Sequence, residues 1–135
     1  MVQFVVMSKV ENQPIGLITL HDVNFQDGYA SVSTTKFSIE DRSLKMMSAL
    51  VLFLDYAFRN WRFRKLYFEV PEYNMEQFDS TVREYLNVEA RLVEHIYTAG
   101  RFWDRITLSL FARDWDDVRS HFAVLIGTGE EATGG

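Results

Sequence analysis

The sequence predicts an α+β fold, in which a mixed, mostly antiparallel sheet combines with three helices in the order βββ-α-β-α-ββ-α. Two observations carry this prediction. Apolar residues first follow the strand period of two, and from Arg42 onward they recur at the helical steps of three and four. A strand-helix-strand passage then lies between sets of strands joined by short turns, which is typical of a mixed sheet.

Three strands are predicted in the first part of the chain, at Gln3–Val10, Ile15–Val23 and Tyr29–Phe37. A polar turn at residues 11–14 separates the first two, and the pair Asp27-Gly28 separates the last two. Asp-Gly readily supplies the positive φ of a tight hairpin turn. Connections as short as these join neighbouring antiparallel strands, so we expect a three-stranded meander.

A helix is predicted over Arg42–Asn60, where the apolar residues form a broad face. A short β-rich run, Arg64–Val70, follows and ends at Pro71. Asn is a favoured residue before the first turn of a helix, so Asn74 is predicted to cap a second helix that ends near Asn87.

Two more strands are predicted at Glu89–Tyr97 and Arg105–Phe111, joined through Ala99-Gly100. Asp114 is placed to cap a last helix that contains Trp115, Val118 and Phe122. No repeat or linker divides the chain, so residues 1–126 are predicted to form a single domain. The Gly-rich, acidic residues 127–135 are predicted to be a disordered tail.

Composition narrows the possible functions. A net charge of −5 and a pI near 5.1 argue against a nucleic-acid partner, which needs clustered Lys and Arg. With no cysteine, the chain has no disulfide, thiolate ligand or Cys nucleophile, and its three histidines are too scattered for a metal site. It has no signal-peptide pattern and no run of 18 apolar residues, so we expect a cytoplasmic protein without a membrane partner.

Several local patterns occur in a fixed order. Ala49 and Tyr56-Ala57-Phe58 precede Arg64-Lys65-Leu66; Asn74 is followed 15 residues later by Glu89-Ala90-Arg91-Leu92; and the chain then reads Trp103-Asp104-Arg105 and Ser109-Leu110-Phe111-Ala112-Arg113-Asp114-Trp115. In this order and spacing they resemble the GNAT acetyltransferase superfamily, most closely the branch with the ribosomal-protein N-acetyltransferases. The resemblance covers most of the chain, from about Pro14 to Trp115.

The resemblance implies a GNAT-like sheet with a splay between two strands that admits acetyl-CoA as cosubstrate. It implies that the third strand, at Thr34, Thr35 and Lys36, pairs its main chain with the pantetheine arm. It also implies that Asn74 lies beside the pantetheine or its pyrophosphate, a role compatible with helix capping.

The loop that would bind the pyrophosphate departs from the family pattern. Residues 41–46 read Asp-Arg-Ser-Leu-Lys-Met, so Leu44 and Met46 stand where the family has glycines. Those glycines let backbone N–H groups approach phosphate closely at a helix N-terminus. Arg42, Ser43 and Lys45 are the candidate phosphate contacts that remain. Arg42 and Lys45 are equally well read as solvated helix residues with no ligand.

The start of the chain is a second departure. Family members normally begin with a strand and one or two helices, which this sequence lacks before the strand matched to the family's second. An uncovered hydrophobic edge strand invites pairing. If this is the complete protein, either another subunit covers the exposed edge and face or the acceptor site is unusual. Of the two we expect the subunit, in a homodimer.

Acyl transfer to an amine needs a base for the ammonium and an acid for the leaving thiolate. Glu69 alternates away from Phe68 and Val70 and is the candidate general base, although a strand Glu is more often a solvated charge. Some family branches use a Tyr seven residues after the Asn as the acid. That position here is Thr81, a poor proton donor.

These observations favour an N-acyltransferase that moves an acetyl group from CoA to an amine, with no metal. The alternative is a catalytically inactive GNAT-like module for dimerisation or ligand binding. A third possibility is a plain α+β domain unrelated to GNAT proteins. Peptide N-termini, aminoglycosides, polyamines and other small amines all remain open as acceptors.

Overall fold

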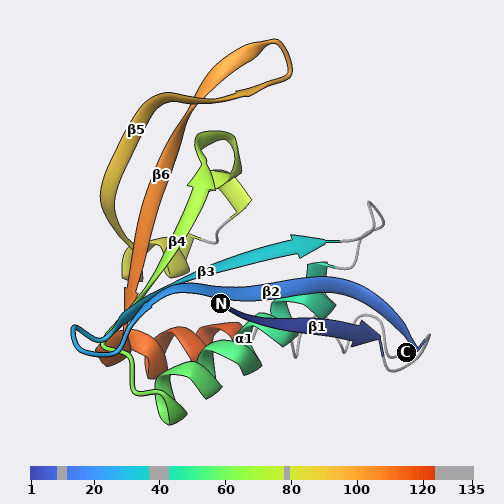
Figure 1. The fold of residues 1–135 in the computed structure, drawn as a ribbon, viewed down its shortest axis with the longest axis vertical. Coiled ribbons are helices and arrows are strands. Elements are labelled where there is room, and N and C mark those ends of the chain that lie inside the picture. Colours follow the sequence, from blue (N-terminus) through green and yellow to red (C-terminus); the bar gives the residue numbers. More distant parts are fainter. Residues whose placement is uncertain (9–11, 37–42, 78–79, 124–135) are drawn as a thin grey trace.

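The computed structural model describes residues 1–8, 12–36, 43–77 and 80–123 (Figure 1). Six strands form one sheet in the order β1-β2-β3-β4-β6-β5. The strands are β1 Val2–Ser8, β2 Gln13–Asn24, β3 Tyr29–Lys36, β4 Lys65–Pro71, β5 Asn87–Thr98 and β6 Arg101–Phe111. The α-helices are α1 Ser43–Asn60, α2 Ser80–Tyr85 and a last helix at residues 115–123, with 3₁₀ turns at Glu72–Gln77 and Ala112–Asp114. The predicted α+β order is confirmed.

The sheet is antiparallel except where β3 meets β4. These two strands pair in parallel for four residues, from Tyr29 opposite Lys65 to Val32 opposite Phe68. Beyond Val32, β3 and β4 separate, and Figure 1 shows them running in different directions from their common end. The family resemblance implies a strand splay, and the structure contains one at this point.

The closed end of the splay is fixed by the turn before β3. The Gly28 carbonyl accepts hydrogen bonds from the N–H groups of Arg64, at 2.7 Å, and Lys65, at 3.2 Å. Gly28 has φ +78°, and a Cβ built on it would lie 3.3 Å from the Arg64 Cβ. Glycine therefore meets two needs here, a left-handed backbone and a close approach of two chain segments.

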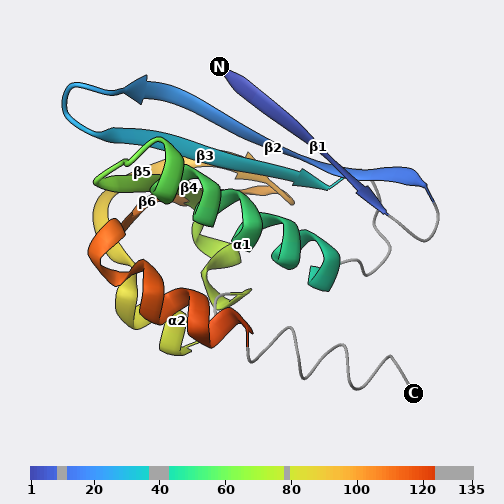
Figure 2. The ribbon, with the colours of Figure 1, turned by 90° about the horizontal axis from the view of Figure 1, so that it is seen from below.

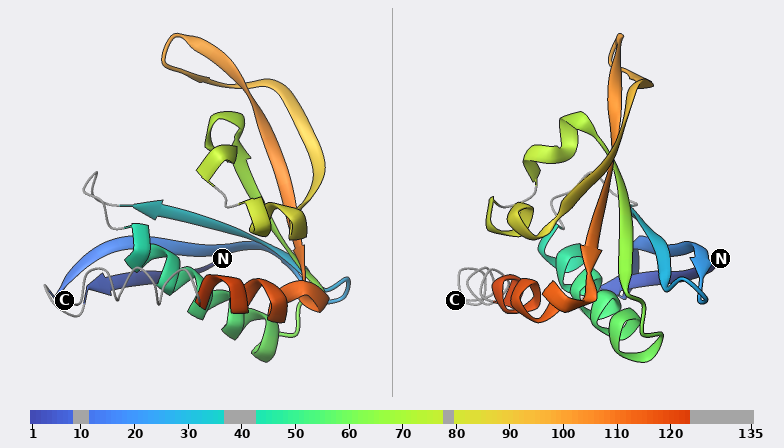
Figure 3. Two further views of the ribbon diagram at one scale, coloured as in Figure 1. Left: turned by 180° about the vertical axis from the view of Figure 1, so that it is seen from behind. Right: turned by 90° about the vertical axis from the view of Figure 1, so that its left-hand side faces the viewer.

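The helices all lie on one face of the sheet (Figures 2 and 3). Residues of alternate strand positions point to that face and meet the apolar side of α1 and the last helix. The hydrophobic core between them consists of Ile18, Leu20, Ala30, Val32, Phe53, Leu54, Ala57, Phe58, Phe63, Leu66, Leu110, Trp115 and Val118. The opposite sheet face carries no helix among the residues described.

Two local predictions are wrong. Asn74 lies inside the 3₁₀ helix that begins directly after β4, and α2 begins only at Ser80, so Asn74 does not cap α2. β6 starts at Arg101 rather than Arg105, because the antiparallel ladder with β5 continues almost to the turn. The rings of Tyr97 and Phe102 face each other across this extension, with centroids 5.1 Å apart. The predicted tail lies outside the described residues.

Candidate functional site

A cavity of about 350 Å³ occupies the space between the diverging strands β3 and β4. Its size is within the range of small-molecule sites. The walls come from β3, β4 and the 3₁₀ helix after β4, and the floor from α1 and the last helix. The lining residues are Val32, Ser33, Thr34, Leu50, Leu54, Phe68, Glu69, Val70, Pro71, Asn74, Leu86, Leu110, Val118 and Phe122.

The β3 wall offers main-chain hydrogen-bonding groups. Residues 33–36 pair with β2 on one side, but the ladder to β4 ends at Val32. Backbone N–H and C=O groups need partners, and alternate residues of a strand direct theirs to the same edge. This stretch of β3 can therefore pair with an extended ligand as if the ligand were a further strand. Thr34 lines the cavity, whereas Thr35 and Lys36 follow along the same strand.

The floor of the cavity is apolar, and Leu50 and Leu54 of α1 lie there opposite Val118 and Phe122 of the last helix. An apolar floor excludes water from the inner end of the site and strengthens electrostatic interactions there. Sequence periodicity assigns Val118 and Phe122 to the last helix but gives no sign that they reach the β3/β4 gap. That relation depends on how the helix docks.

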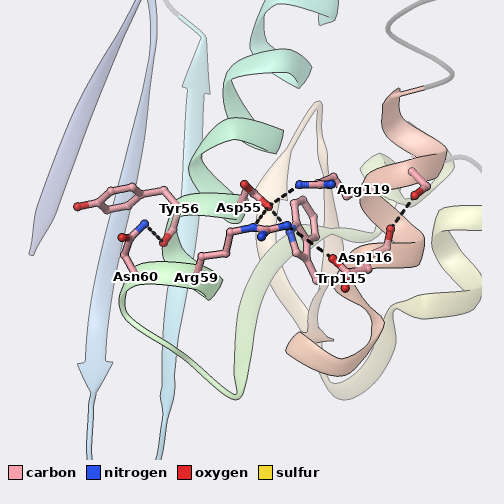
Figure 4. A network of polar contacts seen from close by, with 8 residues as sticks. Asp55, Tyr56, Arg59, Asn60, Trp115, Asp116 and Arg119 are labelled. Carbon is pink, nitrogen blue, oxygen red and sulfur yellow. Dashed lines mark hydrogen bonds and ion pairs between the residues drawn. The ribbon is translucent and has the colours of Figure 1, made fainter.

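Asp55 docks the last helix onto α1 (Figure 4). Its Oδ1 accepts hydrogen bonds from Trp115 Nε1 at 3.0 Å, Arg59 Nε at 2.8 Å and Arg119 Nη1 at 3.2 Å. Hydrogen bonding, first from Trp115 and then from Arg59, lowers the pKa of Asp55 below its ordinary value near 3.8. The Trp115 side chain is buried, so this bond satisfies an indole N–H that water does not reach.

Glu69 lies on the cavity wall and forms an ion pair with Arg105 of β6. A second nitrogen of the same guanidinium is 3.4 Å from His95 Nε2 on β5. The three residues come from three neighbouring strands and form a chain of polar contacts that leads to the cavity. Sequence reasoning missed Arg105, because a cross-strand partner can be named only when the register of the two strands is known.

Asn74 also lines the cavity, because the 3₁₀ helix turns back beside the end of β4. Glu69, Thr34 and Asn74 are thus three sequence-predicted site residues around one space. Their predicted roles depend on a ligand and stay predictions.

The candidate phosphate contacts are more dispersed. Arg42 lies outside the described residues, and Ser43 begins α1 but its side chain is not described. The side chain of Lys45 is exposed, and its Nζ donates a hydrogen bond to Ser8 Oγ at 3.1 Å, at the end of β1. Their predicted contact with pyrophosphate therefore stays a prediction.

Solved structures match this arrangement. The chain superposes on the spermidine/spermine N-acetyltransferase SpeG from Vibrio cholerae, determined in complex with manganese ions, with a TM-score of 0.72, covering 85% of this chain and 67% of that one. The fold is that of the GNAT acetyltransferases. A chimera of the Vibrio cholerae SpeG and hSSAT gives a TM-score of 0.70 over 84% of this chain and 68% of its own. Sequence identity is 21% in both cases.

This chain spans about two thirds of the length of these GNAT proteins. No protein-family model matches the sequence, and the search of curated proteins gave no significant match. Within the ranges that the structure describes, no group of three or more His, Asp or Glu side chains could hold a metal ion. No helix in the same ranges is both long and apolar enough to pass through a membrane.

Proposed function

We propose that the chain is an N-acyltransferase that moves an acetyl group from acetyl-CoA to an amine. The observation that carries the proposal is the β3/β4 splay, with its cavity and the unpaired edge of β3 beyond Val32. In this reaction the amine nitrogen bonds to the acetyl carbon and the carbon–sulfur bond of the thioester breaks. The proton released by the amine finally neutralises the thiolate.

The chain's own groups fit the arm of such a cosubstrate. The main chain of residues 33–36 would hold the pantetheine extended along β3, and Asn74 would donate a hydrogen bond from the facing wall. The apolar floor would keep water from the thioester. The residues that would meet the pyrophosphate, Arg42, Ser43 and Lys45, are proposed from the family pattern alone.

Glu69 is the proposed proton acceptor for the amine. As a carboxylate on the cavity wall it would also attract a cationic ammonium, and Arg105 would hold it in one orientation. The side chain of Thr81 is a poor acid, so we propose that water protonates the thiolate.

The acceptor is proposed to be a small amine. The solved structures that share this fold are named for acetyl transfer to spermidine and spermine, which supports an amine as the acceptor class. We also propose a cytoplasmic location, because acetyl-CoA must be present in the compartment where the reaction takes place.

Calorimetric titration with acetyl-CoA tests the proposed cosubstrate site. Thr34→Trp places an indole on the cavity wall and should lower the affinity at least tenfold. Thr98→Trp, at an exposed strand position near the β5–β6 turn, is the matched control and should bind as the unaltered chain does. Binding that is equally unaffected by both changes would place the ligand elsewhere and remove the basis of the proposal.

A binding module without turnover is the second candidate. Two observations favour it, the ion pair that occupies Glu69 and the absence of the two glycines at Leu44 and Met46. A thiol-release assay with acetyl-CoA and a panel of amines separates the two candidates. Saturable binding with no release of free CoA above the uncatalysed rate would favour the module.

A further inference from the structure

The edge strand β1 is apolar on both faces. Phe4 and Val6 point toward α1, where the Phe4 and Phe53 rings meet with centroids 5.2 Å apart, while Val5 on the opposite face is 57% exposed. The strand has β2 on one side, and its other edge faces no described strand. Residues Val2–Ser8 include no charged side chain.

The apolar surface continues from β1 onto α1. A groove of about 370 Å³ runs between them, with Phe4, Val5 and Met7 on one side and Leu52 and Tyr56 on the other. Leu52 is 73% exposed, although it lies in the middle of a helix whose other face forms the core. The exposed apolar residues of β1 and α1, together with Met1, are called the β1–α1 surface. They are Met1, Val2, Phe4, Val5, Met7, Leu52 and Tyr56.

The other edge of the sheet is built differently. β5 carries Glu89, Arg91 and Glu94, and its pairing with β6 is interrupted between Leu92 and Ile96. Charged side chains and bulges are the features by which proteins keep an edge strand from pairing with another chain. β1 has one register shift, close to its end between Val6 and Met7, and no charge. The two edges therefore differ in how strongly they oppose strand addition.

We propose that the β1–α1 surface is the site at which a second copy of this chain docks, with the two β1 strands antiparallel across a two-fold axis. Its residues are between 39% and 85% exposed, so a second copy would find apolar surface along the whole strand and the facing helix. An uncharged edge strand that borders an exposed apolar groove has the features of an interaction site. The proposal does not depend on the proposed activity.

The chemistry of the strand favours its own copy as occupant. A two-fold axis places each residue opposite its counterpart, so a charged strand would meet like charges, which destabilise a directly opposite pair. β1 carries no charged side chain, so pairing with its own copy brings no like charges together. Val5 is the middle residue of the strand, so the register that uses all of Val2–Ser8 places Val5 opposite Val5 of the second copy. The groove beside it can accept apolar side chains from that copy.

Sedimentation of the purified chain and cysteine cross-linking test the proposal together. The sequence contains no cysteine, so Val5→Cys introduces a unique thiol. Directly opposite residues of an antiparallel pair have Cβ atoms about 5 Å apart, near the reach of a disulfide. Mild oxidation should convert most of the Val5→Cys chain to a covalent dimer. The matched control is Val93→Cys, at a Val of β5 that is 70% exposed, and it should give little covalent dimer.

Charge insertion provides the converse test. Val5→Lys and Leu52→Glu should each raise the dissociation constant of the dimer at least tenfold, while Val93→Lys leaves it unchanged. A chain that sediments only as a monomer at micromolar concentration overturns the proposal and leaves the surface to another partner. A dimer that Val93→Cys cross-links, or that both charged variants retain at full strength, places the interface elsewhere and overturns it as well.

Discussion

Removing the Asp55 side chain should loosen the last helix and with it the floor of the cavity. The Asp55 side chain is 28% exposed and accepts three hydrogen bonds, one of them from an indole that is 2% exposed. In Asp55→Ala the buried Trp115 N–H has no acceptor, whereas Arg59 and Arg119 turn to water. Asp55→Ala therefore affects the one buried contact more strongly than the two partly exposed ones.

The expected cost follows from that difference. Leaving a buried donor unsatisfied costs about 1–3 kcal/mol, and each exposed ion pair contributes about 0–1 kcal/mol. We expect Asp55→Ala to lower the free energy of unfolding by about 2–3 kcal/mol. Asp55→Asn keeps an acceptor for Trp115 and loses only the charge, so we expect a loss of about 1 kcal/mol.

The effect of Asp55→Asn should depend on pH. Because its donors hold the folded-state pKa of Asp55 below the ordinary value near 3.8, the stabilisation is fully present above that value. It is lost as the pH falls through the lower folded-state pKa. The difference in unfolding free energy between the unaltered chain and Asp55→Asn should therefore be constant near neutral pH and shrink under acid conditions.

Urea unfolding followed by Trp fluorescence, from neutral to acid pH, measures these differences. Asp116→Asn is the control, because Asp116 is 87% exposed and its contact with Arg59 is 3.8 Å long. It should change stability by less than about 0.5 kcal/mol. The reasoning is refuted if Asp55→Ala costs no more than Asp116→Asn, or if Asp55→Ala and Asp55→Asn cost the same.

Gly28→Ala should lower the unfolding free energy by about 1–2 kcal/mol in a thermal or urea titration. The positive φ of Gly28 and the nearby Arg64 Cβ both oppose a side chain there. An unchanged midpoint would mean that the turn relaxes freely. If the chain is an acyltransferase, Glu69→Gln should lower kcat roughly 100-fold with little change in the KM for acetyl-CoA. Unchanged turnover would limit Glu69 to its ion pair. Leu44→Gly combined with Met46→Gly should tighten CoA binding in calorimetry by opening the loop to phosphate; equal affinity would show that the phosphates bind elsewhere.

The strand and helix order is accessible from the sequence because it depends on local periodicity and on turns such as Asp27-Gly28. The splay is accessible only through the family resemblance, since nothing in the alternation of Tyr29–Phe37 marks where pairing with the next parallel strand stops. The ion pair of Glu69 and Arg105 depends on the register of β4 and β6, and the apolar floor depends on helix docking through Asp55. These relations are non-local, so one-dimensional patterns do not contain them.

The short parallel ladder between β3 and β4, four residue pairs long, makes amide hydrogen exchange in β3 sensitive to a bound ligand. Amide hydrogens of β3 that bond within the ladder should exchange slowly with solvent, whereas those that point into the gap beyond Val32 have no partner strand and should exchange quickly. The same strand thus carries slow and fast amides a few residues apart. A molecule that lies along the gap should slow the fast set and leave the slow set as it was, so deuterium uptake by one peptide would detect occupancy without any label or assay of turnover.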